Sequence, residues 1–229
     1  NTQINKEAWD YAKEIYLWNN NLPSSFNAAS YSDPNAVMEA IRKYSIEPGF
    51  TNPVDRWSFG IKKSEWDDLS SGIGSDLGLN IFFRSENDLR VSYVEPASPA
   101  AAAGIKRSWR IISINNNTSI QTVNASISRI QNAIFSSSSA TIGFKRPGNA
   151  DTTITLTAAS YQEKPVYLDS IYTVGDKKAG YLVYNSFLGN MDNVKSIFST
   201  VFNHFSNEGI NDLIVDLRYN GGGYVELQN

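Results

Sequence analysis

The sequence contains no cysteine and only one histidine. The absence of cysteine excludes disulfide bonds and thiolate metal sites, and it fits any cellular compartment. No apolar run approaches the ~20 residues that a membrane-spanning helix needs. Lysine and arginine number 20 against 23 aspartate and glutamate residues, so no basic patch of the kind that nucleic-acid binding requires is present. What remains is a 229-residue chain, 41% hydrophobic and 12% aromatic, which suits one large or two small domains.

The most informative stretch lies at residues 211–224. An apolar run at residues 213–217 predicts a strand buried on both faces of a parallel sheet. It leads into Asn220, Gly221, Gly222 and Gly223, where glycine permits positive φ and the backbone N–H groups are free to converge on an anion. Ligands of open α/β sheets bind at this end of a strand. The loop is therefore a candidate anion or oxyanion cradle, although a plain tight turn would also explain the glycines.

A nucleotide site is the weaker interpretation of the same loop. No Gly-Lys-Ser/Thr follows the glycines, and no acidic residue stands at the Rossmann spacing. Asp216 and Arg218 occupy alternate positions on one face of the strand end. We expect them, with Asn220, to support the loop rather than to take part in catalysis.

Residues 1–66 have the pattern of a helical cap. One predicted helical face contains Ile4, Ala8, Tyr11, Ala12, Ile15 and Trp18. Asp33 and Pro34 predict the start of a second helix, as N-cap and first residue, with Val37, Ile41 and Tyr44 on its buried side. We interpret Trp18 and Trp57 as core residues.

Residues 67–160 form a second predicted unit, of short strands and two helices. The strands are expected at residues 77–83, 89–94, 110–114, 140–145 and 152–157. Ser98 and Pro99 predict the start of a short helix that Gly104 ends. The second helix is predicted by apolar residues at helical spacing, Val123, Ile127, Ile130 and Ile134.

Residues 161–229 predict a strand–helix–strand unit with parallel strands. Two strands surround Gly175, and a strongly amphipathic helix then runs from an expected N-cap at Asp192 to Gly209. A single unit of this kind leaves its sheet unfinished and an apolar edge exposed. We therefore expect that the chain ends inside a domain.

Two strings carry a resemblance to a known family. Residues 216–223, DLRYNGGG, resemble the strand-and-glycine motif of the C-terminal processing (tail-specific) serine peptidases, which are related to the tricorn core. Residues 95–105, EPASPAAAAGI, resemble a string of the PDZ domain that these peptidases carry, and residues 16–23 and 55–58 resemble strings of their helical N-terminal segment. The implied fold class is α+β multidomain: a helical N-terminal cap (1–66), a PDZ-like β-barrel or sandwich with two helices (67–160), and the first part of an α/β protease core (161–229).

The resemblance implies a serine-type endopeptidase with a Ser/Lys dyad. In that family the glycine loop helps to form the oxyanion hole, and the serine and lysine lie well after it. We therefore expect no catalytic residue in this chain, with the dyad beyond Asn229, and we expect the chain to be inactive alone. The resemblance implies no cofactor and no metal. It also implies an exported protein, periplasmic or lipid-anchored.

The PDZ resemblance implies that the partners are C-terminal tails of proteins or peptides. Residues 76–79, DLGL, resemble the carboxylate-binding loop, and an exposed strand edge can accept an extended peptide. The predicted peptide-binding residues are Leu77, Gly78, Leu79, Ile81, Val123 and Ile127. The apolar members of this set could equally be ordinary core residues. A complete, non-catalytic PDZ-type binding module is the alternative function.

Two departures and two minor candidates remain. Ser108 and Trp109 stand where the family has Gly-Asp, and Asn115 and Asn116 replace its Asn-Gly turn. We interpret His204 as a helix residue without chemistry. The acidic residues around position 67 are interpreted as a solvated face rather than a metal site.

Overall fold

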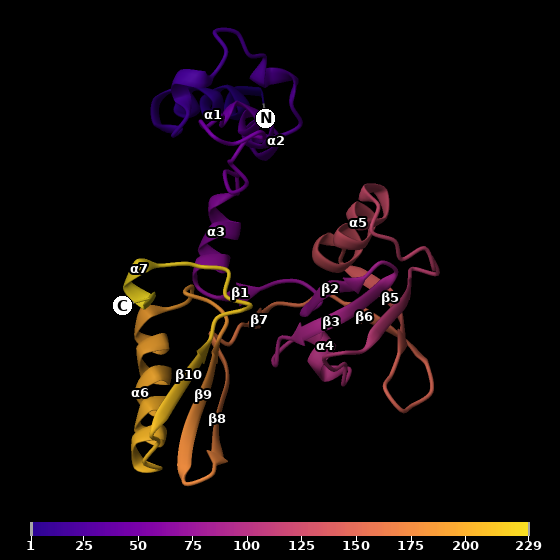
Figure 1. The fold of residues 1–229 in the computed structure, drawn as a ribbon. Helices are drawn as coiled ribbons and strands as arrows, with labels where there is room; N and C mark the ends of the chain where they lie inside the picture. The colour runs from indigo at the N-terminus through magenta and orange to yellow at the C-terminus, as the bar shows by residue number, and fades with distance from the viewer. Residues whose placement is uncertain (1, 229) are drawn as a thin grey trace. The chain divides into compact units, whose positions relative to one another are not determined.

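The computed structural model describes residues 2–228, and the chain divides into two compact units after Trp66. The first unit is helical, as predicted, and is drawn in indigo and purple in Figure 1. Its elements are α1 (Thr2–Ile15), η1 (Asn19–Asn21), η2 (Ala28–Ser30), α2 (Pro34–Ile41) and η3 (Arg42–Tyr44), and α3 (Lys63–Ser70) follows.

The predicted buried face of α1 is right for half of its residues. Ala12 is buried, and Ala8 and Trp18 pack against the core, whereas Ile4, Tyr11 and Ile15 are exposed, with Ile15 79% accessible. The helix also buries Asn5 and Trp9, which were not predicted, with Tyr16 just beyond its end. Both faces of this helix carry apolar residues, and helical spacing alone does not tell which of them packs. The Trp9 ring stacks on Phe26, which places its face of the helix toward the core. Helical spacing within α1 cannot reveal this contact with a later residue.

The start of α2 follows the prediction. The Asp33 side chain accepts a hydrogen bond from the Ala36 N–H at 2.9 Å, Pro34 is the first helical residue, and Val37 and Ile41 are fully buried. Trp18 packs against this core, whereas Trp57 is 81% exposed, so its assignment to the core is wrong.

A buried hydrogen bond ties the end of α1 to a later segment. The Tyr16 hydroxyl donates to Asp55 Oδ2 at 2.8 Å, and Asp55 Oδ1 accepts the N–H groups of Trp57 and Ser58. Burial and the Asp55 carboxylate raise the pKa of Tyr16. Asp55 therefore fixes the turn that follows it, which gives the DRWS string a structural reason.

The PDZ-like part is a five-stranded antiparallel sheet with the order β2-β3-β4-β5-β6. The sheet does not close, so the expected barrel is absent, and β2 and β6 are its edges. The strands and helices match the predicted ones within a few residues. They are β2 (Leu79–Ser85), β3 (Asp88–Val94), α4 (Pro99–Ala102), β4 (Arg110–Ile114), α5 (Asn124–Gln131), the π-helical turn η4 (Asn132–Ser136), β5 (Ser139–Lys145) and β6 (Thr152–Thr157).

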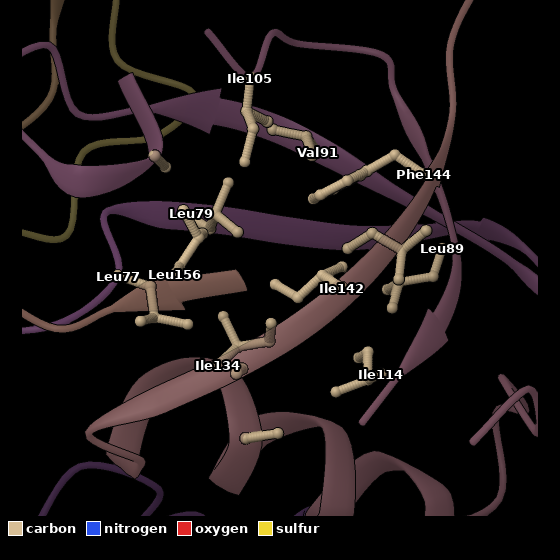
Figure 2. Packing of buried hydrophobic residues seen from close by; sticks show 14 of the residues in the cluster. Leu77, Leu79, Leu89, Val91, Ile105, Ile114, Ile134, Ile142, Phe144 and Leu156 are labelled. Atoms are coloured by element: carbon tan, nitrogen blue, oxygen red, sulfur yellow. The ribbon is translucent and has the colours of Figure 1, made fainter. Parts of the chain in front are cut away.

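One apolar core holds this sheet and its helices together (Figure 2). Side chains from every strand of the sheet, from η4 and from the loops before β2 and after α4 point into it, among them the labelled Leu77, Leu79, Leu89, Val91, Ile105, Ile114, Ile134, Ile142, Phe144 and Leu156. Ser98 caps α4 by accepting the Ala101 N–H at 3.2 Å, as predicted. Gly78 allows the close approach of this cap, because an added Cβ would lie 1.9 Å from Ser98 Cβ.

The two departures from the family strings keep the backbone conformation that glycine usually supplies. Ser108 has φ of 75°, and Asn115 and Asn116 have φ of 50° and 62°. Asparagine tolerates this region well, while a serine there is uncommon. Trp109 packs edge-on against Phe144, with ring centroids 5.6 Å apart, so it is a core residue of this loop.

The last part of the chain is the predicted strand–helix–strand unit. Strands β8 (Val166–Val174), β9 (Lys177–Tyr184) and β10 (Asp212–Asp216) form a sheet of order β10-β9-β8, with β9 and β10 parallel. Helix α6 (Met191–Asn207) lies along one face of it (Figure 1) and packs through Val201 and Phe205. The N-cap of α6 is Asn190, not the expected Asp192.

Strand β10 differs from its prediction as a strand buried on both faces. It is an edge strand, and Leu213, Ile214 and Val215 are exposed. The apolar run still identified the strand correctly. The exposed apolar edge that the sequence predicts for this sheet is formed by β10.

A short antiparallel pair connects the PDZ-like sheet to this last part. Strand β1 (Ile73–Gly74) pairs with β7 (Tyr161–Gln162). The chain enters the PDZ-like domain through β1 and leaves it through β7, so we call this pair the neck. Gly74 lies under the Tyr161 ring, where an added Cβ would come within 2.5 Å of a ring carbon.

Candidate functional site

The glycine loop follows β10 and runs beside the segment that follows β9. The Phe187 N–H donates to Gly222 O at 2.9 Å, and the Tyr224 N–H donates to Phe187 O at 2.8 Å. The Asn220 side chain donates to Tyr184 O at 3.0 Å. The loop is therefore fixed at the carboxyl ends of two parallel strands, the position where open α/β sheets bind ligands.

Only one of the three glycine N–H groups is free to meet a ligand. The Gly221 N–H donates to Asn185 O at 3.4 Å, and the Gly222 N–H donates to Asn220 Oδ1 at 2.8 Å. Within residues 2–228, the Gly223 N–H has no hydrogen-bond partner. We expected several amides to converge on an anion, but of the three glycine amides only that of Gly223 is available for this role within residues 2–228.

Gly223 cannot be replaced without moving the backbone. Its φ is 141°, and an added Cβ would lie 2.3 Å from the carbonyl carbon and oxygen of Phe187. Gly222 also has positive φ, at 94°, whereas Gly221 has an ordinary φ and open space around it. The structure therefore assigns the conformational requirement to the second and third glycines of the motif.

Asp216 and Arg218 pair with each other at the end of β10, and their support of the glycine loop stays a prediction. The Arg218 guanidinium donates to both Asp216 oxygens, at 2.9 Å from Nε and 2.6 Å from Nη2, and the Tyr181 hydroxyl donates to Oδ2 at 2.5 Å. These bonds hold the pKa of the Asp216 carboxyl well below its ordinary value. A carboxylate so fully paired with Arg218 and Tyr181 is suited to holding the strand end in shape.

A contact that the sequence did not reveal joins the PDZ-like domain to the glycine motif. Arg107 donates to the Tyr219 hydroxyl at 2.5 Å, and its guanidinium lies over the Tyr219 ring, 5.4 Å from the centroid. Tyr93 adds a second ring, 5.4 Å from that of Tyr219. These residues, with Tyr181 and Val183, line a cavity of about 170 Å³ that also includes Asp216 and Arg218. Arg107 and Tyr219 are 112 residues apart, so no local pattern could have paired them.

The six predicted peptide-binding residues do not form one surface. Leu77 and Leu79 are 0% and 1% exposed and belong to the core, while Val123 is 54% exposed ahead of α5. Ile81 and Ile127 are half-buried. The Gly78 N–H donates to Asp76 Oδ1 at 2.7 Å, so this amide of the predicted carboxylate loop is occupied. The outer edge of β2 remains the feature of this group that is open to an extended peptide.

Three carboxylates lie at the neck. Asp76 Oδ1 accepts the Tyr161 hydroxyl at 2.5 Å, and Glu95 Oε2 accepts the Lys164 N–H at 3.4 Å. Glu95 is only 6% exposed. Its burial and the nearby Glu163 carboxylate raise the pKa of Glu95 to about 7, and burial and Asp76 also raise the pKa of Glu163. A fraction of the Glu95 carboxyl groups is therefore protonated near neutral pH.

The remaining candidates carry no chemistry that the structure supports. His204 lies on α6 and contacts Asp169 of β8, with Nδ1 and Oδ2 3.5 Å apart. Across residues 2–228, no three acidic or histidine side chains gather as metal ligands would. In the same range, no helix combines the length and the apolar character needed to cross a bilayer.

Comparisons with known proteins support the family resemblance at both ends of the chain. Residues 3–59 match the Peptidase S41 N-terminal domain, and residues 178–228, which include the glycine loop, match peptidase family S41. The predicted resemblance to C-terminal processing peptidases is confirmed, and the chain is related to peptidases. None of the curated protein sequences matches this chain.

A solved structure with a TM-score above 0.5 has a similar fold, and two others with lower scores are also matched. One is a protein of Bacteroides fragilis NCTC 9343 assigned to the S41 proteases, with 21% identity and a TM-score of 0.53 over 96% of this chain and 56% of that one. The photosystem II D1 C-terminal processing protease is 18% identical over 99% of this chain and 62% of that one, with a TM-score of 0.48. The PDZ domain of HtrA3, bound to a phage-derived ligand, matches 39% of this chain and 88% of its own length at 18% identity, with a TM-score of 0.32. This chain thus spans less than two thirds of the first two structures.

Proposed function

We propose that this chain is part of a serine-type endopeptidase of the Ser/Lys class, in which the PDZ-like domain captures C-terminal tails and the glycine loop holds the scissile carbonyl oxygen. The observation that carries the proposal is the N–H of Gly223. Within residues 2–228 this N–H has no hydrogen-bond partner, it follows a parallel strand, and it belongs to the segment that matches the peptidase family. A preorganised donor of this kind lowers the barrier by about 3–4 kcal/mol.

Tail capture is supported by the free edge of β2. An extended peptide that pairs with an edge strand gains main-chain hydrogen bonds, while pockets for its side chains supply specificity. Arg107 and Tyr219 support a link between the two activities, because they join the PDZ-like domain directly to the strand-and-glycine motif. We also propose that the protein is exported.

The nucleophile and base are expected beyond Asn229, so the 229-residue chain should bind tails without cleaving them. The test compares this chain with the full-length protein, using one peptide with a free C-terminal carboxylate and the same peptide amidated. We expect cleavage by the full-length protein alone and faster cleavage of the free-carboxylate peptide. Turnover by the purified 229-residue chain would contradict the assignment of the dyad. Tail binding without cleavage by the full-length protein would favour the non-catalytic module.

A further inference from the structure

One side chain of the strand-and-glycine motif contacts the PDZ-like domain at two points. The half-buried Tyr219 ring lies 5.4 Å from the ring of Tyr93, which belongs to β3. On the loop ahead of β4, Arg107 donates to the Tyr219 hydroxyl at 2.5 Å and places its guanidinium over the ring, where the aromatic face attracts a cation. We call Tyr93 and Arg107 the socket of Tyr219.

The arginine of the socket is bonded to the main chain of β3. Its guanidinium donates to the Ser92 carbonyl oxygen as well as to Tyr219. The next residue, Ser108, has φ of 75° and donates its N–H to Val91 O at 2.9 Å, so the main chain of this loop is held by the same strand. Arg107 therefore connects Tyr219 to a central strand of the PDZ-like sheet and is not a free surface charge.

Tyr219 lies inside the turn that leads into the glycine loop. The Asn220 N–H closes this turn by donating to Leu217 O at 2.9 Å, and Asn220 Oδ1 accepts the Gly222 N–H at 2.8 Å. A shift of Tyr219 therefore moves Asn220 and, through it, Gly222. The next amide is that of Gly223, which has no hydrogen-bond partner among the described residues and is the proposed oxyanion donor.

These contacts make the PDZ-like domain part of the support of the glycine loop. We propose that Arg107 is a positioning residue, which fixes the turn before the loop through Tyr219 and so places the Gly223 N–H for the scissile carbonyl oxygen. This proposal rests on the peptidase function proposed above. The socket is also one strand away from the proposed tail site, because Tyr93 pairs with Asn80 of β2, whose outer edge is free.

The test replaces Arg107 with methionine, which keeps an unbranched side chain and removes the charge and the donors. In the full-length protein, kcat for a peptide should fall roughly 10- to 100-fold, because a misplacement of about 1 Å in a catalytic site can cost about 10²-fold. KM and tail affinity should stay unchanged. Arg146→Met is the matched control. Arg146 also lies over a ring, 5.8 Å from the Trp109 centroid, and donates to a carbonyl, Ala150 O at 2.7 Å, but both partners belong to the PDZ-like domain, so kcat should be kept.

A double variant tests whether Arg107 acts through Tyr219. Tyr219→Phe keeps the ring and removes the hydroxyl that Arg107 binds. If the two residues act as one unit, kcat of the double variant should be no lower than that of Arg107→Met. Three results would overturn the proposal: additive losses in the double variant, an unchanged kcat in Arg107→Met, or an equal loss of kcat in Arg146→Met.

A separate measurement distinguishes failure of this proposal from failure of the proposed function. If the wild-type full-length protein cleaves no peptide, the proposed function itself fails. The role of Arg107 is then judged on the 229-residue chain by NMR, from the assigned amide signals of Gly221, Gly222 and Gly223. Arg107→Met should shift these signals and Arg146→Met should not. Unshifted signals in Arg107→Met would refute the positioning role.

Discussion

Replacing Gly223 with alanine should abolish most of the peptidase activity while leaving tail binding intact. The added Cβ would meet the Phe187 carbonyl carbon and oxygen at 2.3 Å and the Leu188 nitrogen at 2.7 Å, all of them backbone atoms that cannot rotate away. The φ of 141° adds strain for any residue with a side chain. The backbone must therefore shift, and the free N–H of Gly223 shifts with it.

The size of the effect follows from the role of that N–H. An oxyanion donor contributes about 3–4 kcal/mol, so its displacement should lower kcat by roughly 10²–10³-fold. Gly221→Ala is the matched control, because Gly221 has an ordinary φ and nothing within 4 Å of an added Cβ. This control should change the free energy of unfolding by less than about 0.5 kcal/mol and leave kcat near the wild-type value.

Three measurements decide the outcome: kcat of the full-length protein, tail-peptide affinity by fluorescence polarisation, and thermal unfolding of the 229-residue chain. We expect a large loss of kcat for Gly223→Ala only, with unchanged affinity in both variants. Near-wild-type turnover by Gly223→Ala would refute the assignment of the oxyanion donor. An equal loss in Gly221→Ala would refute the reasoning from local geometry.

Three further predictions concern stability. Because the pKa of Glu95 is raised to about 7, the folded protein binds more protons than the unfolded chain between about pH 4.5 and 7, and the free energy of unfolding should fall as pH rises through this window, by on the order of 1–3 kcal/mol. Glu95→Gln should remove this pH dependence in urea titrations. Wild-type and variant stabilities that change with pH in parallel would contradict the prediction. Gly78→Ala should lower the free energy of unfolding by more than about 2 kcal/mol because of the clash with Ser98. The control Gly104→Ala, at φ of 73° with open space around it, should lower it by only about 1–2 kcal/mol. Equal urea midpoints for the two variants would show that the clash is relieved. Tyr16→Phe should destabilise the first unit by about 1–3 kcal/mol, read from hydrogen exchange of α1 and α2, because Asp55 loses a buried donor; unchanged exchange would mean that water replaces the hydroxyl.

The parts of the fold that sequence predicted well depend on local chemistry. The N-caps Asp33 and Ser98 bond to N–H groups three residues ahead, so the residues that define each helix start are adjacent in sequence. The strand leading into the glycine loop was likewise identified by its run of branched residues. The prediction of an N-cap failed where two suitable residues lie close together, since Asn190 rather than Asp192 caps α6.

The parts that sequence missed depend on distant contacts. The apolar residues of α1 give no sign that Trp9 packs inward on Phe26 while Ile15 lies outside. Within the candidate site, the motif identified the glycines, but only the path of residues 184–187 shows that the Gly221 amide is occupied, while the Gly222 amide bonds to the adjacent Asn220 side chain. The contact between Arg107 and Tyr219 becomes visible only in the folded arrangement.

The neck has a consequence for how such a protein can be built and altered. Ile73 and Gln162 are direct partners in it, so the two ends of the intervening 88-residue stretch of chain are only one strand spacing apart. A module whose ends meet in this way can be exchanged or bridged by a short loop without stretching the polypeptide on either side. The PDZ-like sheet and the glycine loop are therefore separable by protein engineering, with the contact between Arg107 and Tyr219 to be rebuilt in any chimera.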